Sequence, residues 1–191
     1  LQVEDASNAN LTIAASVQLD TPTGADIWTV TEGADITWTL HGVMDFVHLW
    51  WSQDNGTTWT RITGDAGTAA AVGTYHWNSV AEGLVGSTCR ICVSKRMASG
   101  ETEPGIVKSV SAAFVSRGKL ILSTFDSEGE MYLAGSSQSI VWDAKGTNLG
   151  NVRIYYAADG SDFSTLLTDT TPASDETFTW TPLPATTTNT G

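Results

Sequence analysis

The fold of this protein is decided by the stretch Phe46–Trp59, which has the sequence FVHLWWSQDNGTTW. Its first half alternates with the period of a β-strand, and it places Val47 and Leu49 on one face with bulky residues on the other. The DNG that follows suits a tight turn, because Gly and Asn tolerate positive φ and Asp can accept hydrogen bonds from nearby amides. Thr57–Ile62 is again rich in β-forming residues. The stretch therefore predicts a β-hairpin.

The same pattern returns about a hundred residues later, at Asn151–Phe163. The matched landmarks are Trp28 with Tyr132, Ile36-Thr37-Trp38 with Ile140-Val141-Trp142, Val47, Leu49 and Trp51 with Val152, Ile154 and Tyr156, and Tyr75-His76-Trp77 with Phe178-Thr179-Trp180. The spacings between these landmarks agree closely in the two copies. A period of roughly 100 residues is the size of one β-sandwich domain.

Short β-prone runs separated by Gly, Asp, Asn and Pro turns fill the chain, without convincing helical periodicity. This predicts an all-β protein of tandem immunoglobulin- or fibronectin-III-like β-sandwiches, the second incomplete within the chain. We expect residues 1–16 to be closing strands of a preceding or neighbouring sandwich, 17–116 a complete domain, and 117–191 the N-terminal part of a second domain lacking its last strands. The expected core aromatics are Trp38, Trp77, Trp142 and Trp180.

The start of the chain resembles strands that the second copy lacks. The first copy has expected strands at Cys89–Ser94 and Val110–Val115, and the second copy stops before their counterparts. Residues 1–17 resemble them instead, since Leu1 and Val3 match Ile91 and Val93. We therefore expect a self-assembly strand whose apolar residues are Leu1, Val3, Leu11 and Ile13.

Three explanations of these ends remain open. The chain can be one period of a longer tandem array whose copies are covalently continuous. Each molecule can instead donate its first strands to the incomplete sandwich of a neighbour, which builds a filament by strand addition. In the third explanation Leu1–Val17 folds back onto the second copy of the same chain. In each case an unpaired sheet edge would be an aggregation hazard unless something fills it.

Composition limits the classes of partner. The chain has 21 acidic and 9 basic residues, a formal net charge of -12, and this charge disfavours nucleic acid and anionic membranes as partners. A charged fraction of 16% with abundant Thr, Ser, Gly and Ala is typical of secreted or surface-exposed β proteins. The sequence has no apolar run of 18 residues, so membrane insertion is not expected. It also has no initiator Met and no signal peptide, so we expect a processed or excised piece.

The two cysteines, Cys89 and Cys92, have the C-x-x-C spacing but lie in a β-strand pattern. Residues three apart on a strand point to opposite faces, so a mutual disulfide or a shared metal is geometrically unfavourable. The sequence predicts two separate thiols, one of which packs inward as a small apolar residue.

A family resemblance rests on the pattern Trp28…Gly33…Ile36-x-Trp38…Gly42…Val47-x-Leu49-x-x-Ser52-x-Asp54-x-Gly56-x-Thr58-Trp59…Gly73-x-Tyr75-x-Trp77…Cys89-Arg90-Ile91-x-Val93. It resembles the Ig-like sandwich repeats of large bacterial surface proteins, which are similar to the Kre9/Knh1-like cell-wall domain family. The resemblance implies a cell-surface or secreted scaffold, adhesion or stalk module without catalysis. The second copy departs from the pattern, because Ala157 replaces the Ser and Phe163 the Trp.

The residues Ser52, Asp54, Gly56, Thr58 and Trp59 are also similar to an Asp-box, the hairpin turn of sialidase-like β-propellers. The resemblance implies a folding device in which Asp54 accepts turn amides and Trp59 packs beneath the hairpin. Propeller blades recur at about 40 to 50 residues, whereas this repeat is twice as long, and this disfavours a propeller.

The sequence offers little catalytic chemistry. It has no nucleophile-elbow, zincin, Walker or dinucleotide-binding signature, so we expect no enzyme and no catalytic residue. His41, His48 and His76 have no metal-ligand spacing and are expected to be ordinary strand or turn residues. We expect no cofactor, although Asp159-Gly160-Ser161-Asp162 has oxygen ligands for Ca²⁺; a plain turn is the simpler interpretation.

The sequence thus predicts a non-catalytic extracellular structural module that assembles head to tail into a surface filament, stalk or sheath. Its partners would be other copies of itself, through covalent repeats or strand complementation. The alternative is a carbohydrate-binding or adhesion accessory module that binds cell-surface glycans through exposed aromatics such as Trp28, Trp50 or Tyr155. A sialidase-type enzyme is a distant third hypothesis.

Overall fold

The computed structural model describes residues 14–127, 130–158 and 160–185. In this part of the chain the regular structure is β-strand, apart from the single 3-10 turns η1 (Ala70–Val72) and η2 (Ala173–Asp175). The prediction of an all-β protein is confirmed. The predicted self-assembly residues Leu1, Val3, Leu11 and Ile13 lie outside the described residues.

The strands of the first repeat are β1 (Ser16–Thr21), β2 (Ile27–Thr29), β3 (Ala34–His41), β4 (Phe46–Ser52), β5 (Thr60–Arg61), β6 (Thr68–Ala69), β7 (Thr74–Trp77), β8 (Gly86–Lys95), β9 (Lys108–Val110) and β10 (Phe114–Arg117). Those of the second are β11 (Lys119–Leu122), β12 (Gln138–Lys145), β13 (Asn151–Tyr156), β14 (Thr165–Pro172) and β15 (Thr177–Trp180).

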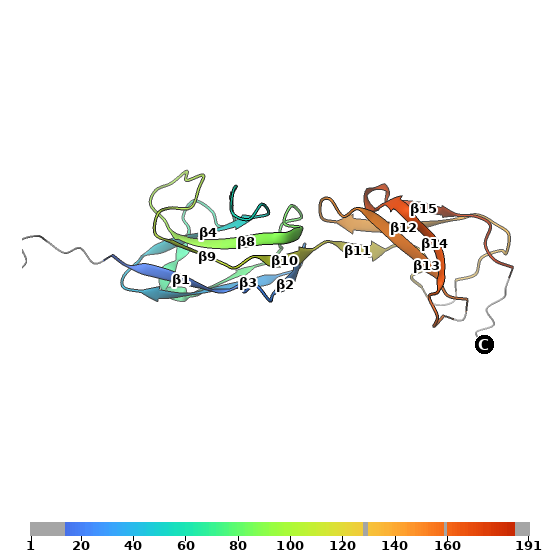
Figure 1. The fold of residues 1–191 in the computed structure, drawn as a ribbon, viewed down its shortest axis with the longest axis horizontal. Helices are drawn as coiled ribbons and strands as arrows, with labels where there is room; N and C mark the ends of the chain where they lie inside the picture. Colours follow the sequence, from blue (N-terminus) through green and yellow to red (C-terminus); the bar gives the residue numbers. More distant parts are fainter. Residues whose placement is uncertain (1–13, 128–129, 159, 186–191) are drawn as a thin grey trace, which may run out of the picture. The chain divides into compact units, whose positions relative to one another are not determined.

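The first repeat has two sheets. One has the strand order β1-β3-β7, and the other has the order β2-β10-β8-β4-β5, with β6 also pairing β4 and β9 also pairing β8. Strand β2 runs parallel to β10, and β4 runs antiparallel to β8. In Figure 1, β1 and β3 lie in one layer and β4 and β8 in the other. The expected hairpin forms, because β4 pairs with β5 and places Trp51 opposite Thr60.

The core of the first repeat follows from the alternation of its strands. Ile36 and Trp38, two apart on β3, are both buried, and so are Val47 and Leu49 on β4. Further buried apolar residues are Val30, Val80, Leu84, Ile91, Val93 and Phe114. Removing each such side chain from water contributes roughly 1.5 to 3 kcal/mol to the free energy of unfolding.

The second repeat has a three-stranded sheet of order β11-β12-β15 and a two-stranded sheet of β13 and β14. Its core has Ile140 and Trp142 of β12, Val152 of β13, and Ala173. Partly buried apolar residues pack around this core; they are Phe125, Ala144, Leu149, Ile154, Leu167, Phe178 and Trp180.

Matching hydrogen bonds show that the internal repeat is structural. The indole N–H of Trp38 donates to the carbonyl of Ala70 at 2.8 Å, and the indole N–H of Trp142 donates to the carbonyl of Ala173 at 2.8 Å. Both acceptors begin a 3-10 turn, and the residue after each turn, Gly73 or Glu176, is left-handed. That residue's carbonyl accepts from the backbone N–H of the same tryptophan, at 2.9 Å in the first repeat and 3.1 Å in the second.

The correspondence extends to the loops. The amide of Thr37 donates to Oγ1 of Thr21 at 3.0 Å, and the amide of Val141 donates to Oγ1 of Thr124 at 2.9 Å. The amide of Thr31 donates to the carbonyl of Val80, as that of Gly135 does to the carbonyl of Leu183. The same local chemistry therefore builds both copies.

One predicted strand is wrong. Val110–Val115 is not continuous, because β9 ends at Val110 and β10 begins at Phe114. Ser111 explains the interruption. Its amide donates to the carbonyl of Ile91, and its side-chain Oγ, not a backbone carbonyl, accepts from the amide of Ile91 at 3.0 Å.

The chain divides into two compact units, and the division falls inside the first repeat. One unit contains Asp35–Trp77 and Arg90–Phe114, and the other contains Ile27–Ala34, Asn78–Cys89 and the described residues from Val115 on. The boundaries expected from the sequence, at 16/17 and 116/117, stay a prediction.

Cys89 and Cys92 are free thiols, as expected, but both are buried. Residues on both faces of β8 are buried along Ile91–Ser94, so the second thiol is buried as well as the one expected to pack inward. Burial raises the pKa of both thiols, that of Cys92 to about 12.

Replacing Trp38 by Phe should remove the donor for the Ala70 carbonyl while retaining most of the buried ring. The Ala70 carbonyl would keep only the longer hydrogen bond from the amide of Gly73, at 3.4 Å. Loss of one hydrogen bond costs about 0.5 to 1.5 kcal/mol, so we expect a loss of that size in urea unfolding. Trp51→Phe is the matched control, because Trp51 is only partly buried. Equal losses in the two variants would contradict a role for the indole hydrogen bond.

Candidate functional site

Among the residues that the structure describes, one strand edge of the second repeat has no partner. In the first repeat β4 has β8 along one edge and β5 and β6 along the other. Its counterpart β13 pairs, among the described residues, with β14 alone. The chain order indicates which edge is filled, because β14 directly follows β13 as β5 and β6 directly follow β4. Val152 lies opposite Thr171 of β14 as Val47 lies opposite Thr68 of β6. Strand β14 thus takes the place of β6, and the edge that corresponds to the β8 side of β4 has no described partner. We call it the open edge.

Matched side chains near this edge differ in exposure. Trp50 on β4 is 1% exposed, whereas Tyr155, at the same place on β13, is 41% exposed. In the first repeat Trp50 lies opposite Cys92 of β8, and its indole N–H donates to Oγ of Ser94, which is also on β8. Tyr155 is therefore exposed at the position where, in the first repeat, β8 covers its counterpart Trp50.

The first strand of the second repeat shows the same difference. Leu19 on β1 lies opposite Trp38, and Leu122 on β11 lies opposite Trp142. Leu19 is half-buried, with its amide donating to Oγ of Ser109 on β9, whereas Leu122 is 47% exposed. Two residues earlier, Val17 is 7% exposed and its counterpart Leu120 is 51% exposed. Leu120 and Leu122 on β11 and Tyr155 on β13 are thus exposed, whereas their counterparts in the first repeat are buried or half-buried. We call these three residues the apolar margin.

The DNG turn of the first repeat is held by the carboxylate of Asp54. Its Oδ1 accepts from the amides of Thr57 and Thr58 at 3.1 and 2.8 Å and from the hydroxyl of Ser52 at 2.7 Å. Its Oδ2 accepts from the Thr58 hydroxyl at 2.7 Å. The amide of Gly56 donates to Oγ of Ser52 at 2.8 Å, and a φ of 91° at Gly56 explains the glycine.

These hydrogen bonds stabilise the charged form of Asp54. Those from Thr58, first the backbone amide and then the hydroxyl, do most to lower the pKa of the carboxyl, to about 2. The ring of Trp59 lies under the turn, so close to Gly56 that a Cβ there would be 3.2 Å from it. Arg90 of β8 donates to the side chain of Asn55 at 2.6 Å. The five Asp-box residues therefore form a rigid turn fastened to β8.

A polar cleft of about 360 Å³ lies beside this turn. It is lined by Gly56, Thr57, Thr58, Trp59, Thr102, Glu103, Pro104 and Lys108. One aromatic ring, several hydroxyls and one charge of each sign are groups that can bind a polar ligand.

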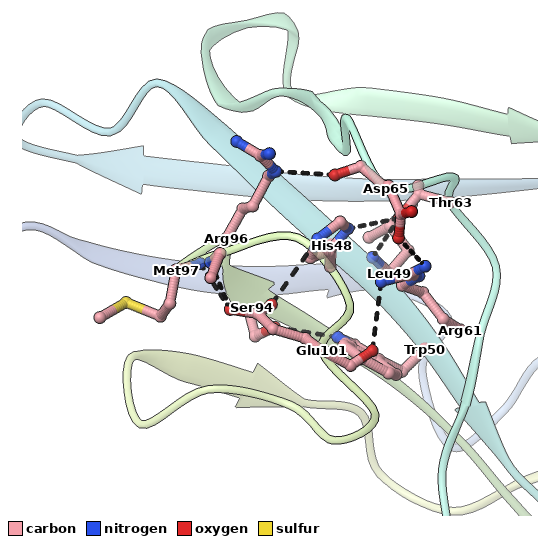
Figure 2. Close-up of polar contacts among 11 residues, drawn as sticks. His48, Leu49, Trp50, Arg61, Thr63, Asp65, Ser94, Arg96, Met97 and Glu101 are labelled. Carbon is pink, nitrogen blue, oxygen red and sulfur yellow. Dashed lines mark hydrogen bonds and ion pairs between the residues drawn. The ribbon is translucent and has the colours of Figure 1, made fainter.

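A buried polar cluster lies on the outer face of β4 (Figure 2). His48 is fully buried, its Nδ1 is 3.0 Å from Oγ1 of Thr63, and its Nε2 is 3.6 Å from Oε2 of Glu101. Glu101 also accepts through Oε1 from the amides of Met97 and Ala98, at 2.7 and 2.9 Å. The cluster was not foreseen, since spacing in the sequence gave no reason to link His48 with Glu101.

The surroundings of His48 favour the neutral imidazole. Burial lowers the pKa of His48 more than the neighbouring Glu101 carboxylate raises it, and Arg61 and Arg96 lower it further. Oγ1 of Thr63 already accepts from the amide of Leu49, so its hydroxyl proton is free to donate to Nδ1. The Nε2–H then points at Glu101. At 3.6 Å this contact is not a hydrogen bond, and the loop is tied to β5 by Arg61, which donates to the carbonyl of Glu101 at 3.1 Å. His48 is closed to solvent and therefore cannot reach a substrate.

The predicted core aromatics are buried to different degrees. Trp38 and Trp142 are buried, whereas Trp77 and Trp180 are half-buried. Of the three aromatics suggested for sugar stacking, Trp50 is buried and Trp28 is half-buried, which leaves Tyr155 exposed.

No group of three or more His, Cys, Asp or Glu side chains that could hold a metal occurs among the described residues. Asp159 of the suggested Ca²⁺ turn lies outside them, so that hypothesis is untested. Within the same residues no helix is long and apolar enough to cross a membrane.

Comparisons with known proteins give little more. No family model matches the chain, and no curated protein is found to be similar to it. Among solved structures, the fibronectin(III)-like modules of Clostridium thermocellum CbhA match with 12% sequence identity, 87% of this chain and 79% of that chain covered, and a TM-score of 0.30. No comparison supports the Kre9/Knh1-like family specifically.

Replacing Asp54 by Asn should lower the melting temperature at pH 7. Because folding lowers the pKa of Asp54 from 3.8 to about 2, its contribution is present above pH 3.8 and is lost as the pH falls through 2. The gap in melting temperature between wild type and variant should therefore narrow between pH 4 and pH 2. Asp169→Asn, at an exposed position on β14, is the control and should show no such narrowing.

Replacing His48 by Gln should reduce the loss of stability in mild acid. Since folding lowers the pKa of His48 below 6.5, its contribution is present above pH 6.5 and declines as the pH falls below that value. One such group changes the free energy of unfolding by at most about 1.4 kcal/mol per pH unit. Urea unfolding at pH 7 and pH 5 measures this, with the exposed His76→Gln as control. Equal pH slopes in wild type and His48→Gln would rule the effect out.

Proposed function

We propose that this protein is a non-catalytic extracellular structural module that assembles head to tail into a surface filament, stalk or sheath. The observation that carries the proposal is the open edge of β13 with its exposed margin of Leu120, Leu122 and Tyr155. Such an edge is a template for another strand, and natural proteins fill or blunt their edges. The open edge carries no Pro and only one charged side chain, that of Arg153.

The added strand can come from another copy in two ways. In a covalent array it belongs to the next period of the same polypeptide, and in strand complementation it belongs to a separate molecule. Both ways put a strand equivalent to β8 beside β13, so the first repeat is the template for the completed second repeat. The net charge of -12 keeps such an assembly soluble and disfavours nucleic acid and anionic membranes as partners.

The second candidate is a carbohydrate-binding or adhesion accessory module. The observation in its favour is the polar cleft, where Trp59 lies together with Glu103 and Lys108. Glycan binding that is lost on Trp59→Ala and unaffected by changes at the open edge would favour this candidate.

Sedimentation velocity of the full chain over a wide concentration range tests self-association. We expect concentration-dependent growth to head-to-tail oligomers, visible as fibres by electron microscopy. Leu122→Asp should weaken the association about tenfold or more, because it places a charge in the apolar margin. Ile106→Asp is the matched control, since Ile106 is 98% exposed and lies in the first repeat. A chain that stays monomeric at all concentrations would exclude assembly between separate molecules.

The covalent route has its own measurement. Two copies joined in one polypeptide should bury Leu122 and Tyr155 of the leading copy. The second repeat of that copy should then exchange its amide hydrogens more slowly than in the single chain. Unchanged exchange in the joined chain would contradict completion by a following copy.

A further inference from the structure

We infer that the strand that completes the second repeat is residues 1–5 of a second copy, aligned so that its Glu4 lies opposite Arg153 of β13. The inference rests on the proposed self-assembly and adds the occupant of the open edge, its register and the charge pair that selects this register.

The register follows from the first repeat. There β4 and β8 are antiparallel, with Trp51 opposite Ile91, Leu49 opposite Val93 and His48 opposite Ser94. The repeat replaces Trp51, Leu49 and His48 by Tyr156, Ile154 and Arg153.

On the donor side, Leu1 and Val3 match Ile91 and Val93, so Glu4 takes the place of Ser94. The pairs in the completed repeat are therefore Leu1 with Tyr156, Gln2 with Tyr155, Val3 with Ile154 and Glu4 with Arg153.

This alignment gives each face of the donor suitable neighbours. Leu49 and Val93 are both fully buried in the first repeat, and Ile154 is half-buried without a described neighbour on this side. Val3 would pack against Ile154 and extend the core around Val152. A slip of one residue would turn Leu1 and Val3 to the outer face and bring Glu4 to the core face, so the apolar pattern opposes it.

Charge separates this alignment from a slip of two residues. In the first repeat the outer pair is His48 with Ser94, both buried beneath the polar cluster. In the second repeat Arg153 is exposed, and directly opposite residues of unlike charge on antiparallel strands attract. A slip of two residues would place Glu4 opposite Tyr155 or Asn151 and lose the pair. Arg153 is also one of 9 basic residues in a chain with 21 acidic ones, so few alternative partners for Glu4 exist.

Reciprocal charge variants of the full chain test the inference. Glu4→Arg and Arg153→Glu each put like charges opposite one another, and each should weaken self-association roughly five- to tenfold. The double variant E4R/R153E should associate to within about twofold of the wild type. The control is Asp169→Arg, which makes the same change of charge as Glu4→Arg. Asp169 lies on β14, the strand at the other edge of β13, so this variant should associate to within about twofold of the wild type.

Mixing the two single variants identifies the donor. In a 1:1 mixture every contact between unlike molecules pairs a positive with a negative residue, so association should return to near the wild-type level. Rescue in the double variant without rescue in the mixture would mean that the strand comes from the same chain, and it would overturn a second copy as the occupant.

The remaining outcomes are distinct. Single variants that associate as well as wild type would overturn the register while leaving the proposed self-assembly intact. A wild-type chain that does not associate at all would remove both.

Discussion

A β-strand presents unpaired N–H and C=O groups along any edge that lacks a neighbour, and the rest of this structure depends on how those edges are filled. In the first repeat β8 and β6 fill both edges of β4, and its side chains from Val47 to Trp50 are buried. In the second repeat β14 fills one edge of β13, and Tyr155 is exposed beside the other. The matched strands β4 and β13 thus differ in their pairing, because β4 has partners on both edges and β13 has a described partner on one.

The two copies share their internal supports. In each, a tryptophan (Trp38 of β3 or Trp142 of β12) donates to the first carbonyl of a 3-10 turn, which ties the turn to the sheet. The copies differ in what surrounds this support. In the first, His48 and Trp50 on the outer face of β4 are buried, and Glu101 lies against His48. The second has Arg153 and Tyr155 exposed at the matching positions.

The parts of the site differ in how far they could be predicted from sequence. The Asp54 turn was accessible because its hydrogen bonds join residues within four positions of one another. The His48–Glu101 pair was not, since the 52 intervening positions carry no spacing signal and burial of His48 depends on a distant loop. The break between β9 and β10 was missed because the Ser111 hydroxyl substitutes for a backbone acceptor. This substitution does not change the periodicity of apolar residues in the sequence. The burial of both Cys89 and Cys92 was missed for a related reason, because it depends on cover from other segments.

The sequence by itself determined what depends on near neighbours: the β class, the alternation of the strands, the DNG turn and the internal repeat, because period and turn chemistry are local. The tertiary structure alone decided which strand edge is filled. The patterns of β4 and β13 are alike, yet only the arrangement in space shows that β14 takes the place of β6 and that the described residues supply no counterpart of β8. Strand pairing joins residues far apart in the chain, so edge and burial are properties of the assembled sheets.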